Sequence, residues 1–371
     1  TQPLIKADPG NWMKEVAGKN LEATIQDIKS NSDPAVREAA VRALPYFGPK
    51  ARELGAANLM YALTRDTDYN VRVAALEVMP AVCLAMGYLN YPDKVYEDGL
   101  TAAFNLTDSD FYPLKLHAVT AVAAFGFYPK FAPRIVSKLV SQAKGSSSSY
   151  QYRRAAVAAL AVYGQGVQFS EESRPDPDNT AVAGLIDVLK NDNSAIVRKE
   201  AVMSLIALGP VAAAATPKWR NDLEAVVRKE KDKSVLLWTR TCLVRNDPAG
   251  PKANAAHLDA IAETLNHREP VGRLEACQAF TVLAEDGVSK LRDLLTVAQN
   301  EKEPAIQAAA IGALATMKSQ LAAILPILQA IISNPAANAD VKKVATSAIT
   351  ELNKKDPAPM PGPMPMPVPK K

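Results

Sequence analysis

One segment recurs along this chain at intervals of 34 to 45 residues. It first occurs as "DPAVREAAVRALPYFG", residues 33–48, in which Asp33 is typical of a helix N-cap, Pro34 of the first helical position and Gly48 of a helix end. Related segments are "DYNVRVAALEVMP", "NSAIVRKEAVMSLIALG" and "EPAIQAAAIGALA". Repetition at this interval predicts an elongated stack of similar helical units in place of one compact core.

Nine copies align on one residue of the repeated helix, which we call the anchor. The anchors are Val36, Val71, Leu114, Tyr152, Val197, Val235, Gly272, Ile306 and Val341. The next residue is basic in seven copies, the exceptions being Leu236 and Gln307. Four places after the anchor the residue is alanine in eight copies and Thr239 in the ninth, and eight places after it the residue is large and apolar. Such a face lets neighbouring helices approach closely, so the units are expected to stack.

A second amphipathic segment precedes each repeated helix, which makes the unit a helix pair. These segments are 21–28, 56–63, 95–104, 131–142, 180–189, 219–228, 258–265, 291–298 and 321–332. Two prolines, Pro45 and Pro80, lie late in the repeated helices of the first two copies and are expected to kink or end them.

An acidic turn followed by Val-Arg and an Ala-Leu face resembles the HEAT-repeat family, specifically its bacterial HEAT-like members, over about residues 20–353. The resemblance implies an all-α fold, an α-solenoid built as a superhelical stack of about nine HEAT-like helix pairs. It divides the chain into an N-terminal extension (1–19), the solenoid (20–353) and a Pro/Met-rich tail (354–371).

In that family an aspartate of the turn pairs with the basic residue of a neighbouring layer. The resemblance assigns this role to Asp66 with Arg72, Asp192 with Arg198 and Asp33 with Arg37. The charge ladder is expected to break at the sixth and eighth copies, where Leu236 and Gln307 replace the base.

The sequence offers no catalytic, cofactor or metal constellation, so we predict a protein that is not an enzyme and binds no cofactor. His117, His257 and His267 stand apart from other ligand residues, and the three cysteines, Cys83, Cys242 and Cys277, lie within helical patterns, which favours inert core thiols over a disulfide or a reactive cysteine. The formal net charge is only +4, which favours a structural charge ladder over a nucleic-acid surface. No run of 18 apolar residues predicts a membrane span.

Aromatic residues are concentrated in the first half of the sequence. All eleven tyrosines and six of the eight phenylalanines fall between residues 46 and 163. Several are expected in loops or turns and are candidates for partner binding: Tyr69, Tyr88, Tyr91, Phe111, Tyr112, Tyr128 and Tyr150. Packing of longer, irregular repeats is an equally good explanation. The family resemblance adds exposed candidates on the second helices, namely Glu38, Arg42, Glu77, Arg154 and Lys199.

These observations predict a non-enzymatic scaffold that binds a protein partner of unknown identity. The alternatives are a structural component of a periplasmic or cell-surface assembly and a chromophore-lyase-like HEAT protein that cradles a tetrapyrrole. The tail "DPAPMPGPMPMPVPKK" is expected to adopt polyproline II conformation, as a tether or as a ligand for an aromatic groove. The first residues, Thr1 and Gln2, fit signal-peptide removal, loss of an initiator methionine or a trimmed chain, so the soluble protein is assigned neither to the cytoplasm nor to an exported state.

Overall fold

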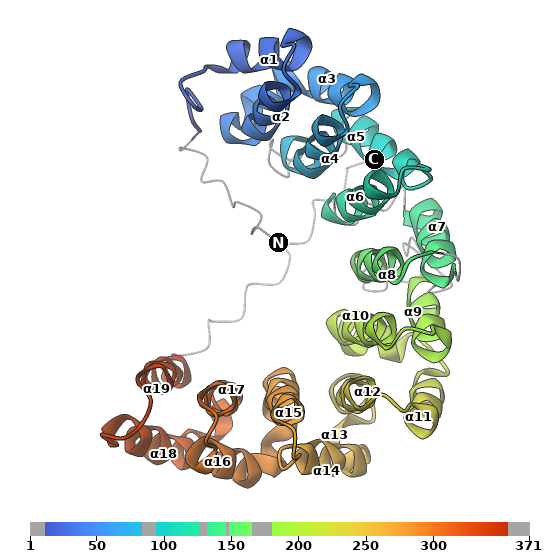
Figure 1. The fold of residues 1–371 in the computed structure, drawn as a ribbon. Coiled ribbons are helices and arrows are strands. Elements are labelled where there is room, and N and C mark those ends of the chain that lie inside the picture. Colours follow the sequence, from blue (N-terminus) through green and yellow to red (C-terminus); the bar gives the residue numbers. More distant parts are fainter. Residues whose placement is uncertain (1–11, 84–93, 126–131, 146–147, 165–179, 355–371) are drawn as a thin grey trace, which may run out of the picture. The chain divides into compact units, whose positions relative to one another are not determined.

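The computed structural model describes residues 12–83, 94–125, 132–145, 148–164 and 180–354 (Figure 1). Within these ranges the chain is helical, and the β pairing consists of an isolated antiparallel bridge between Val16 and Lys19. The predicted all-α fold is confirmed. Contacts divide the chain into two compact units, residues 1–235 and 236–371, which are described separately.

The first unit is a stack of helix pairs, which we number as layers in chain order. The first helices of layers 1 to 6 are α1 (Leu21–Ser30), α3 (Pro49–Arg65), α5 (Lys94–Leu106), α7 (Ala132–Lys144), α9 (Thr180–Asn191) and α11 (Trp219–Lys229). The second helices of layers 1 to 5 are α2 (Pro34–Ala43), α4 (Tyr69–Cys83), α6 (Tyr112–Ala124), α8 (Tyr150–Gly164) and α10 (Ala195–Ala214). Each second helix contacts the next, so α2, α4, α6, α8 and α10 form one continuous row (Figure 1).

The second helix of layer 6, α12 (Lys233–Asn246), contains the boundary between the units, and a short helix, α13 (Gly250–Ala253), follows it. Layers 7 to 9 of the second unit consist of α14 (Ala255–Thr264) with α15 (Pro270–Leu283), α16 (Leu291–Asn300) with α17 (Pro304–Leu314), and α18 (Leu321–Ser333) with α19 (Ala339–Leu352). Here too α15 packs on α17 and α17 on α19. Among the described residues the nine predicted helix pairs are all present, and the α-solenoid fold class is confirmed.

The predicted small column lies in the core between layers. Every alanine of that column and Thr239 are buried, and Ala156 and Ala201 have no exposed surface. Large residues of the neighbouring column, such as Leu160 and Leu205, are likewise fully buried. Because small and large side chains alternate on the second helices, adjacent layers interdigitate and each layer buries the apolar face of the next.

Prolines and one glycine interrupt the second helices. α2 ends at Ala43 and continues as a short 3-10 helix, η1 (Leu44–Phe47), that contains Pro45, as predicted. Pro80 does not end α4, which continues to Cys83, where the buried Arg52 donates from Nε to the Cys83 carbonyl oxygen at 2.9 Å. In α10, Gly209 has a φ of 77° directly before Pro210, so the helix is broken there.

No single helix in the described ranges is both long and apolar enough to cross a membrane, although α17 and α18 taken together, with a 93° bend between them, pass that test by length and composition.

Candidate partner-binding surface

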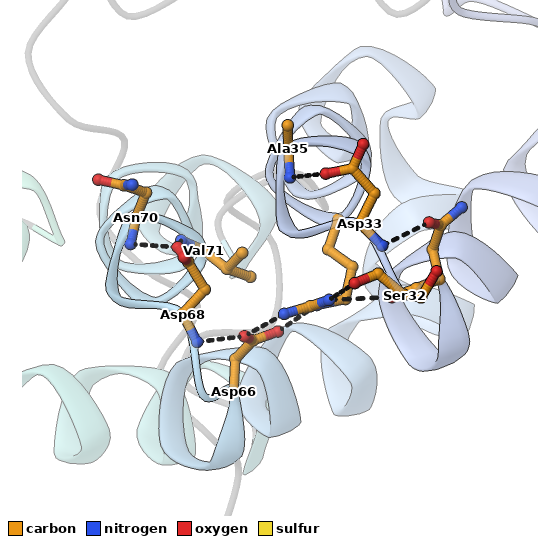
Figure 2. Close-up of polar contacts among 9 residues, drawn as sticks. Ser32, Asp33, Ala35, Asp66, Asp68, Asn70 and Val71 are labelled. Atoms are coloured by element: carbon orange, nitrogen blue, oxygen red, sulfur yellow. Dashed lines mark hydrogen bonds and ion pairs between the residues drawn. The ribbon is translucent and has the colours of Figure 1, made fainter.

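Arginines at the start of the second helices link successive layers. Arg37 donates from Nε and Nη2 to the two carboxylate oxygens of Asp66 in layer 2, at 2.8 and 2.9 Å (Figure 2). Its Nη1 also donates to the Asn31 and Ser32 carbonyl oxygens. The same two-bond geometry recurs in three further pairs: Arg153 with Asp192, Arg198 with Glu230 and, in the second unit, Arg273 with Glu301. The base of one layer therefore holds the turn of the next layer.

The ladder between layers was predicted, but the three residue pairs assigned to it are wrong. Asp33 does not pair with Arg37, because its carboxylate accepts from the Ala35 N–H and caps α2 (Figure 2). Asp192 binds Arg153 of the preceding layer, and Arg198 of its own layer reaches only the Asp192 carbonyl oxygen. Asp66 likewise pairs backwards with Arg37, while Arg72 donates to the Leu63 carbonyl oxygen.

Burial and hydrogen bonding act in opposite directions on these carboxylates. Burial favours the neutral acid, but the hydrogen bonds from Arg37 and from the Asp68 N–H outweigh it and lower the pKa of Asp66. For Glu301 the hydrogen bonds from Arg273 are the largest influence, and they also lower its pKa. These acids are therefore structural anions through which a preceding arginine holds the turn. Leu236 and Gln307, which replace that arginine, carry no charge for such a pair, and Gln307 instead donates to the Ala298 carbonyl oxygen within its own layer.

The charged candidates on the second helices pair with one another across layers. Arg42 donates to Glu38 at 2.8 Å and to Glu77 of layer 2 at 2.6 Å, and Glu77 faces His117 Nδ1 of layer 3 at 3.3 Å. Arg154 of α8 donates to Glu200 of α10 at 2.7 Å. Two of the candidates predicted to be exposed, Glu38 and Lys199, are only half-exposed.

A row of exposed aromatic side chains runs over layers 2 to 4. Tyr69, Tyr112 and Tyr150 are the first residues of α4, α6 and α8, and Phe111 directly precedes α6. We call these four residues the aromatic row. They were expected in loops or turns, but three of them are helical and occupy the same position in consecutive layers. These four residues are 41–45% exposed.

Contacts between the layers fix the aromatic row. The rings of Tyr69 and Phe111 meet edge to face, with centroids 4.8 Å apart and an interplanar angle of 84°. The hydroxyl groups of Tyr112 and Ser149 are 2.6 Å apart, and Ser149 is the neighbour of Tyr150. The backbone below Tyr69 is held by Asp68, whose carboxylate accepts from the Asn70 and Val71 N–H groups (Figure 2). Contacts between layers thus hold Tyr69, Phe111 and Tyr112 in place.

Phe111 occupies a position that is polar in the other eight layers. The residues at this position are Asp33, Asp68, Ser149, Ser194, Asp232, Glu269, Glu303 and Asn338. Five of these residues, Asp33, Asp68, Ser149, Asp232 and Asn338, accept a hydrogen bond from an N–H group at the helix start. Ser194, Glu269 and Glu303 make no side-chain cap, and neither does Phe111, which is the one apolar residue at this position. Exchanging a cap for a half-exposed phenyl ring gives up about 0.5–2 kcal/mol of helix stability.

Some of the other tyrosines pack in the core, and some lie outside the residues that the structure describes. Tyr96, Tyr152 and Tyr163 are buried, with hydroxyls donating to the carbonyl oxygens of Phe125, Thr107 and Val122, respectively. The candidates Tyr88, Tyr91 and Tyr128 lie outside the described residues, as do residues 355–371 of the tail. Packing therefore accounts for Tyr96, Tyr152 and Tyr163, whereas the aromatic row is partly exposed and its binding role stays a prediction.

The described part of the chain was predicted to hold no metal cluster and only core cysteines. No group of three or more His, Cys, Asp or Glu side chains in it could hold a metal ion. Cys83, Cys242 and Cys277 are buried, as predicted for core thiols, and burial raises the pKa of Cys277 to about 12.

Comparison with known proteins gives structural relatives only. No protein-family model and no curated protein matches the sequence. Yeast importin-beta (Kap95p) is similar in fold, with 12% identity, a TM-score of 0.63 and 90% of this chain covered. A Kap95:Nup1 complex gives 10% identity, a TM-score of 0.58 and 90% coverage, and importin beta in ammonium sulfate gives 10%, 0.57 and 89%. This chain spans 46% of each of those chains. The likeness therefore shows a repeat-solenoid fold of the importin-beta kind.

Proposed function

We propose that this protein is a non-enzymatic, HEAT-like scaffold that binds a protein partner through the aromatic row of layers 2 to 4. The observation that carries the proposal is the repeated exposure of aromatic rings at one helix position in three consecutive layers. Tyrosine and phenylalanine bring a large contact area with few rotatable bonds, and tyrosine is enriched among the residues that dominate binding energy. A row held by contacts between layers loses little conformational entropy when a partner binds.

Packing alone accounts for the row poorly. The contacts of Tyr69 with Phe111 and of Tyr112 with Ser149 leave more than two fifths of each aromatic side chain exposed. A polar cap in place of Phe111 would stabilise α6 more directly. Loss of a local stabilising device at an exposed position is characteristic of functional sites. These considerations favour binding over packing for the four residues of the row.

The printed partners of the structural relatives agree with a protein ligand. Kap95 was solved with Nup1, and Kap95p is described as binding RanGDP. Both are proteins held by a solenoid of this kind, although the identity between the chains is only 10%. We therefore place a protein on this chain by analogy of fold, with the row as the particular contact. The charged candidates Arg42, Glu77 and Arg154 then act as secondary contacts, because their charges are already paired.

The test compares three full-length chains as bait in extract from the native organism, with captured proteins quantified by mass spectrometry. The baits are the wild type, the triple variant Tyr69→Ala/Tyr112→Ala/Tyr150→Ala and the control Tyr61→Ala. Tyr61 lies on the first helix α3 and is 56% exposed, so the control removes an exposed tyrosine elsewhere in layer 2. We expect a partner that the wild type and the control capture equally and the triple variant loses at least tenfold. A partner retained equally by all three baits would overturn the proposal.

A further inference from the structure

We propose that a groove between the first helices of layers 5 and 6 binds an acidic segment of a protein, separately from the aromatic row. The groove lies between α9 and α11, which are neighbours in the first unit (Figure 1). The aromatic row lies at the starts of α4, α6 and α8, so the two surfaces have no residue in common. The inference therefore goes beyond the proposed function and does not depend on it.

Two adjoining pockets form this groove, and Lys190 of α9 lines both of them. Their volumes are about 360 Å³ near the start of α11 and about 290 Å³ near its end. The apolar residues that line them are Ala183, Ile186 and Pro217 in the larger pocket and Leu189, Ala225 and Val226 in the smaller one. A concave surface that combines apolar side chains with a few charged groups is the usual form of a binding site.

The charged residues of the groove leave an excess of positive charge. Every acid that lines the two pockets is already paired with a base: Asp187 with Lys144, Asp222 with Lys190, Asp192 with Arg153 and Glu230 with Arg198. Three lysines that line them, Lys218, Lys229 and Lys231, are exposed, and their ammonium groups have no partner among the described residues. Charge complementarity therefore favours an acidic ligand.

The positions of the lysines indicate the shape of that ligand. Lys218 is the N-cap residue of α11 and Lys229 is its last residue, and Ala225 and Val226 lie between them. The 11 residues of α11 span about 16 Å at 1.5 Å per residue. A helix of about twelve residues, with carboxylates at both ends and an apolar middle, therefore matches the groove in length and in charge.

A protein segment suits this groove better than a nucleic acid does. The paired acids along the groove repel a continuous phosphate backbone, whereas the separate carboxylates of a protein can lie at the lysines alone. Single-stranded nucleic acids also bind by stacking their bases on aromatic side chains. The residues that line the two pockets include no aromatic side chain.

The first experiment measures binding of a labelled twelve-residue peptide to the full-length protein by fluorescence anisotropy. The peptide is blocked at both termini and has two glutamates at each end with leucine and alanine between them. A control peptide has lysine in place of each glutamate. We expect the glutamate peptide to bind at least tenfold more tightly than the lysine peptide, and its affinity to fall as salt screens the charges. Equal affinities would overturn the inference, as would tighter binding of a thymidine pentanucleotide, which also carries four negative charges.

The second experiment compares two triple variants that remove the same charge. The groove variant is Lys218→Gln/Lys229→Gln/Lys231→Gln, and the control, which changes exposed lysines elsewhere in the first unit, is Lys14→Gln/Lys29→Gln/Lys50→Gln. We expect the groove variant to bind the glutamate peptide at least tenfold more weakly than the wild type does, and the control variant to stay within twofold. Equal affinities of the two variants would show that the peptide responds to overall charge and would overturn the inference.

A single substitution tests the groove apart from its lysines. Ala183 is exposed and lines the larger pocket, so Ala183→Glu adds a carboxylate that repels the glutamate peptide. The control is Ala57→Glu on α3, which makes the same change at an exposed alanine of layer 2. We expect several-fold weaker binding in Ala183→Glu alone, and weakening in both variants or in neither would overturn the inference. The triple tyrosine variant of the aromatic row should bind the peptide as the wild type does, so this inference and the proposed function fail separately.

Discussion

Successive layers of the first unit are joined at their turns in two ways. Between layers 4 and 5 and between layers 5 and 6, Arg153 and Arg198 form two-bond ion pairs with Asp192 and Glu230. Around layer 3 aromatic rings take part instead: Tyr69 meets Phe111, and Lys115 lies over the buried Tyr152 ring at 4.8 Å from its centroid. The basic residue is present in both regions, so the base alone does not decide which contact forms.

The deciding residue is the one that follows the first helix of the next layer. It is acidic where an ion pair forms, as at Asp66, Asp192, Glu230 and Glu301. In layers 3 and 4 it is Thr107 and Gly145, which carry no charge. There the Thr107 carbonyl oxygen accepts from the Gln142 amide and the Tyr152 hydroxyl. One backbone arrangement thus accommodates two interface chemistries, and the aromatic one leaves rings at the surface that a partner can use.

The largest expected effect is on the ion-pair interface. Asp192→Ala leaves the buried guanidinium of Arg153 without its carboxylate, so that only the uncharged oxygens of Ser148 and Asn193 remain as acceptors. Both side chains of the pair are only 5% exposed. Breaking a buried pair in this way destabilises by about 3–5 kcal/mol. The control is Asp187→Ala, which removes the more exposed pair with Lys144 and costs below about 1 kcal/mol. Urea unfolding followed by helical circular dichroism compares them, and equal losses would show that the ladder contributes no more than surface charge.

The second-largest expected effect on stability comes from overpacking the contact between two layers. Ala156 of α8 has no exposed surface and belongs to the small column, so Ala156→Leu forces neighbouring helices apart and destabilises by about 1–3 kcal/mol. Ala39→Leu places the same extra volume on an exposed site of α2. Thermal melting of both variants measures the difference. Equal melting temperatures of the two variants would show that the layers have room for a larger side chain at the small column. Close approach of the helices would then not explain why this column contains small residues.

The fold was readable from sequence because a repeat presents the same evidence nine times. One copy such as 33–48 is ambiguous, but small residues at Ala40, Ala75 and Ala118 in the same place define a buried stripe. Termini of the helices were less predictable, since Pro80 is accommodated inside α4. The predicted ion pairs were wrong because each joins an acid and a base of the same repeat, whereas in the structure the acid pairs with the arginine of the preceding repeat. Aligning the residue after each first helix against the base of the preceding copy gives the correct pairs.

The sequence predicted the candidate surface only in part. The tyrosine excess indicated the first half of the chain, but burial depends on which side of a helix faces its neighbour, and Tyr150 and the buried Tyr152 are only two residues apart. Alignment of the copies does contain a signal for the aromatic row. Three consecutive copies have a tyrosine two places before the anchor, and Phe111 stands in a column that is otherwise polar. What the surface binds depends on a second molecule or segment, about which the repeat carries no direct information.

Acid should distinguish the two interface chemistries. The pKa of Glu230 lies below its ordinary value of 4.5 in the folded protein, where the hydrogen bonds from Arg198 outweigh burial. The pair therefore stabilises the fold fully above that ordinary pKa, and the contribution is lost as the pH falls through the lower folded value. The difference in unfolding free energy between the wild type and Glu230→Gln is expected to be largest near pH 7 and to shrink below about pH 4. A difference independent of pH would exclude ionisation of Glu230 as its source.

The smallest and most discriminating change is at Phe111, where two variants are expected to differ in stability but not in binding. Phe111→Asp introduces the aspartate cap that Asp33 and Asp68 provide in layers 1 and 2, and it places a negative charge at the start of α6, which the helix dipole favours. Phe111→Ala removes the same ring and its contact with Tyr69 without providing a cap. We therefore expect the aspartate variant to be more stable than the alanine variant by about 1 kcal/mol.

Both Phe111 variants should lose affinity for the captured partner by a similar factor, because both lack the ring. Urea unfolding and a binding titration on the same two proteins measure the two quantities. If Phe111→Asp is no more stable than Phe111→Ala, the helix start is satisfied without a side-chain cap and the ring displaces nothing. If both variants bind as the wild type does, Phe111 serves the contact with layer 2 alone, and the aromatic interface is a structural substitute for the ion pair that Thr107 cannot form.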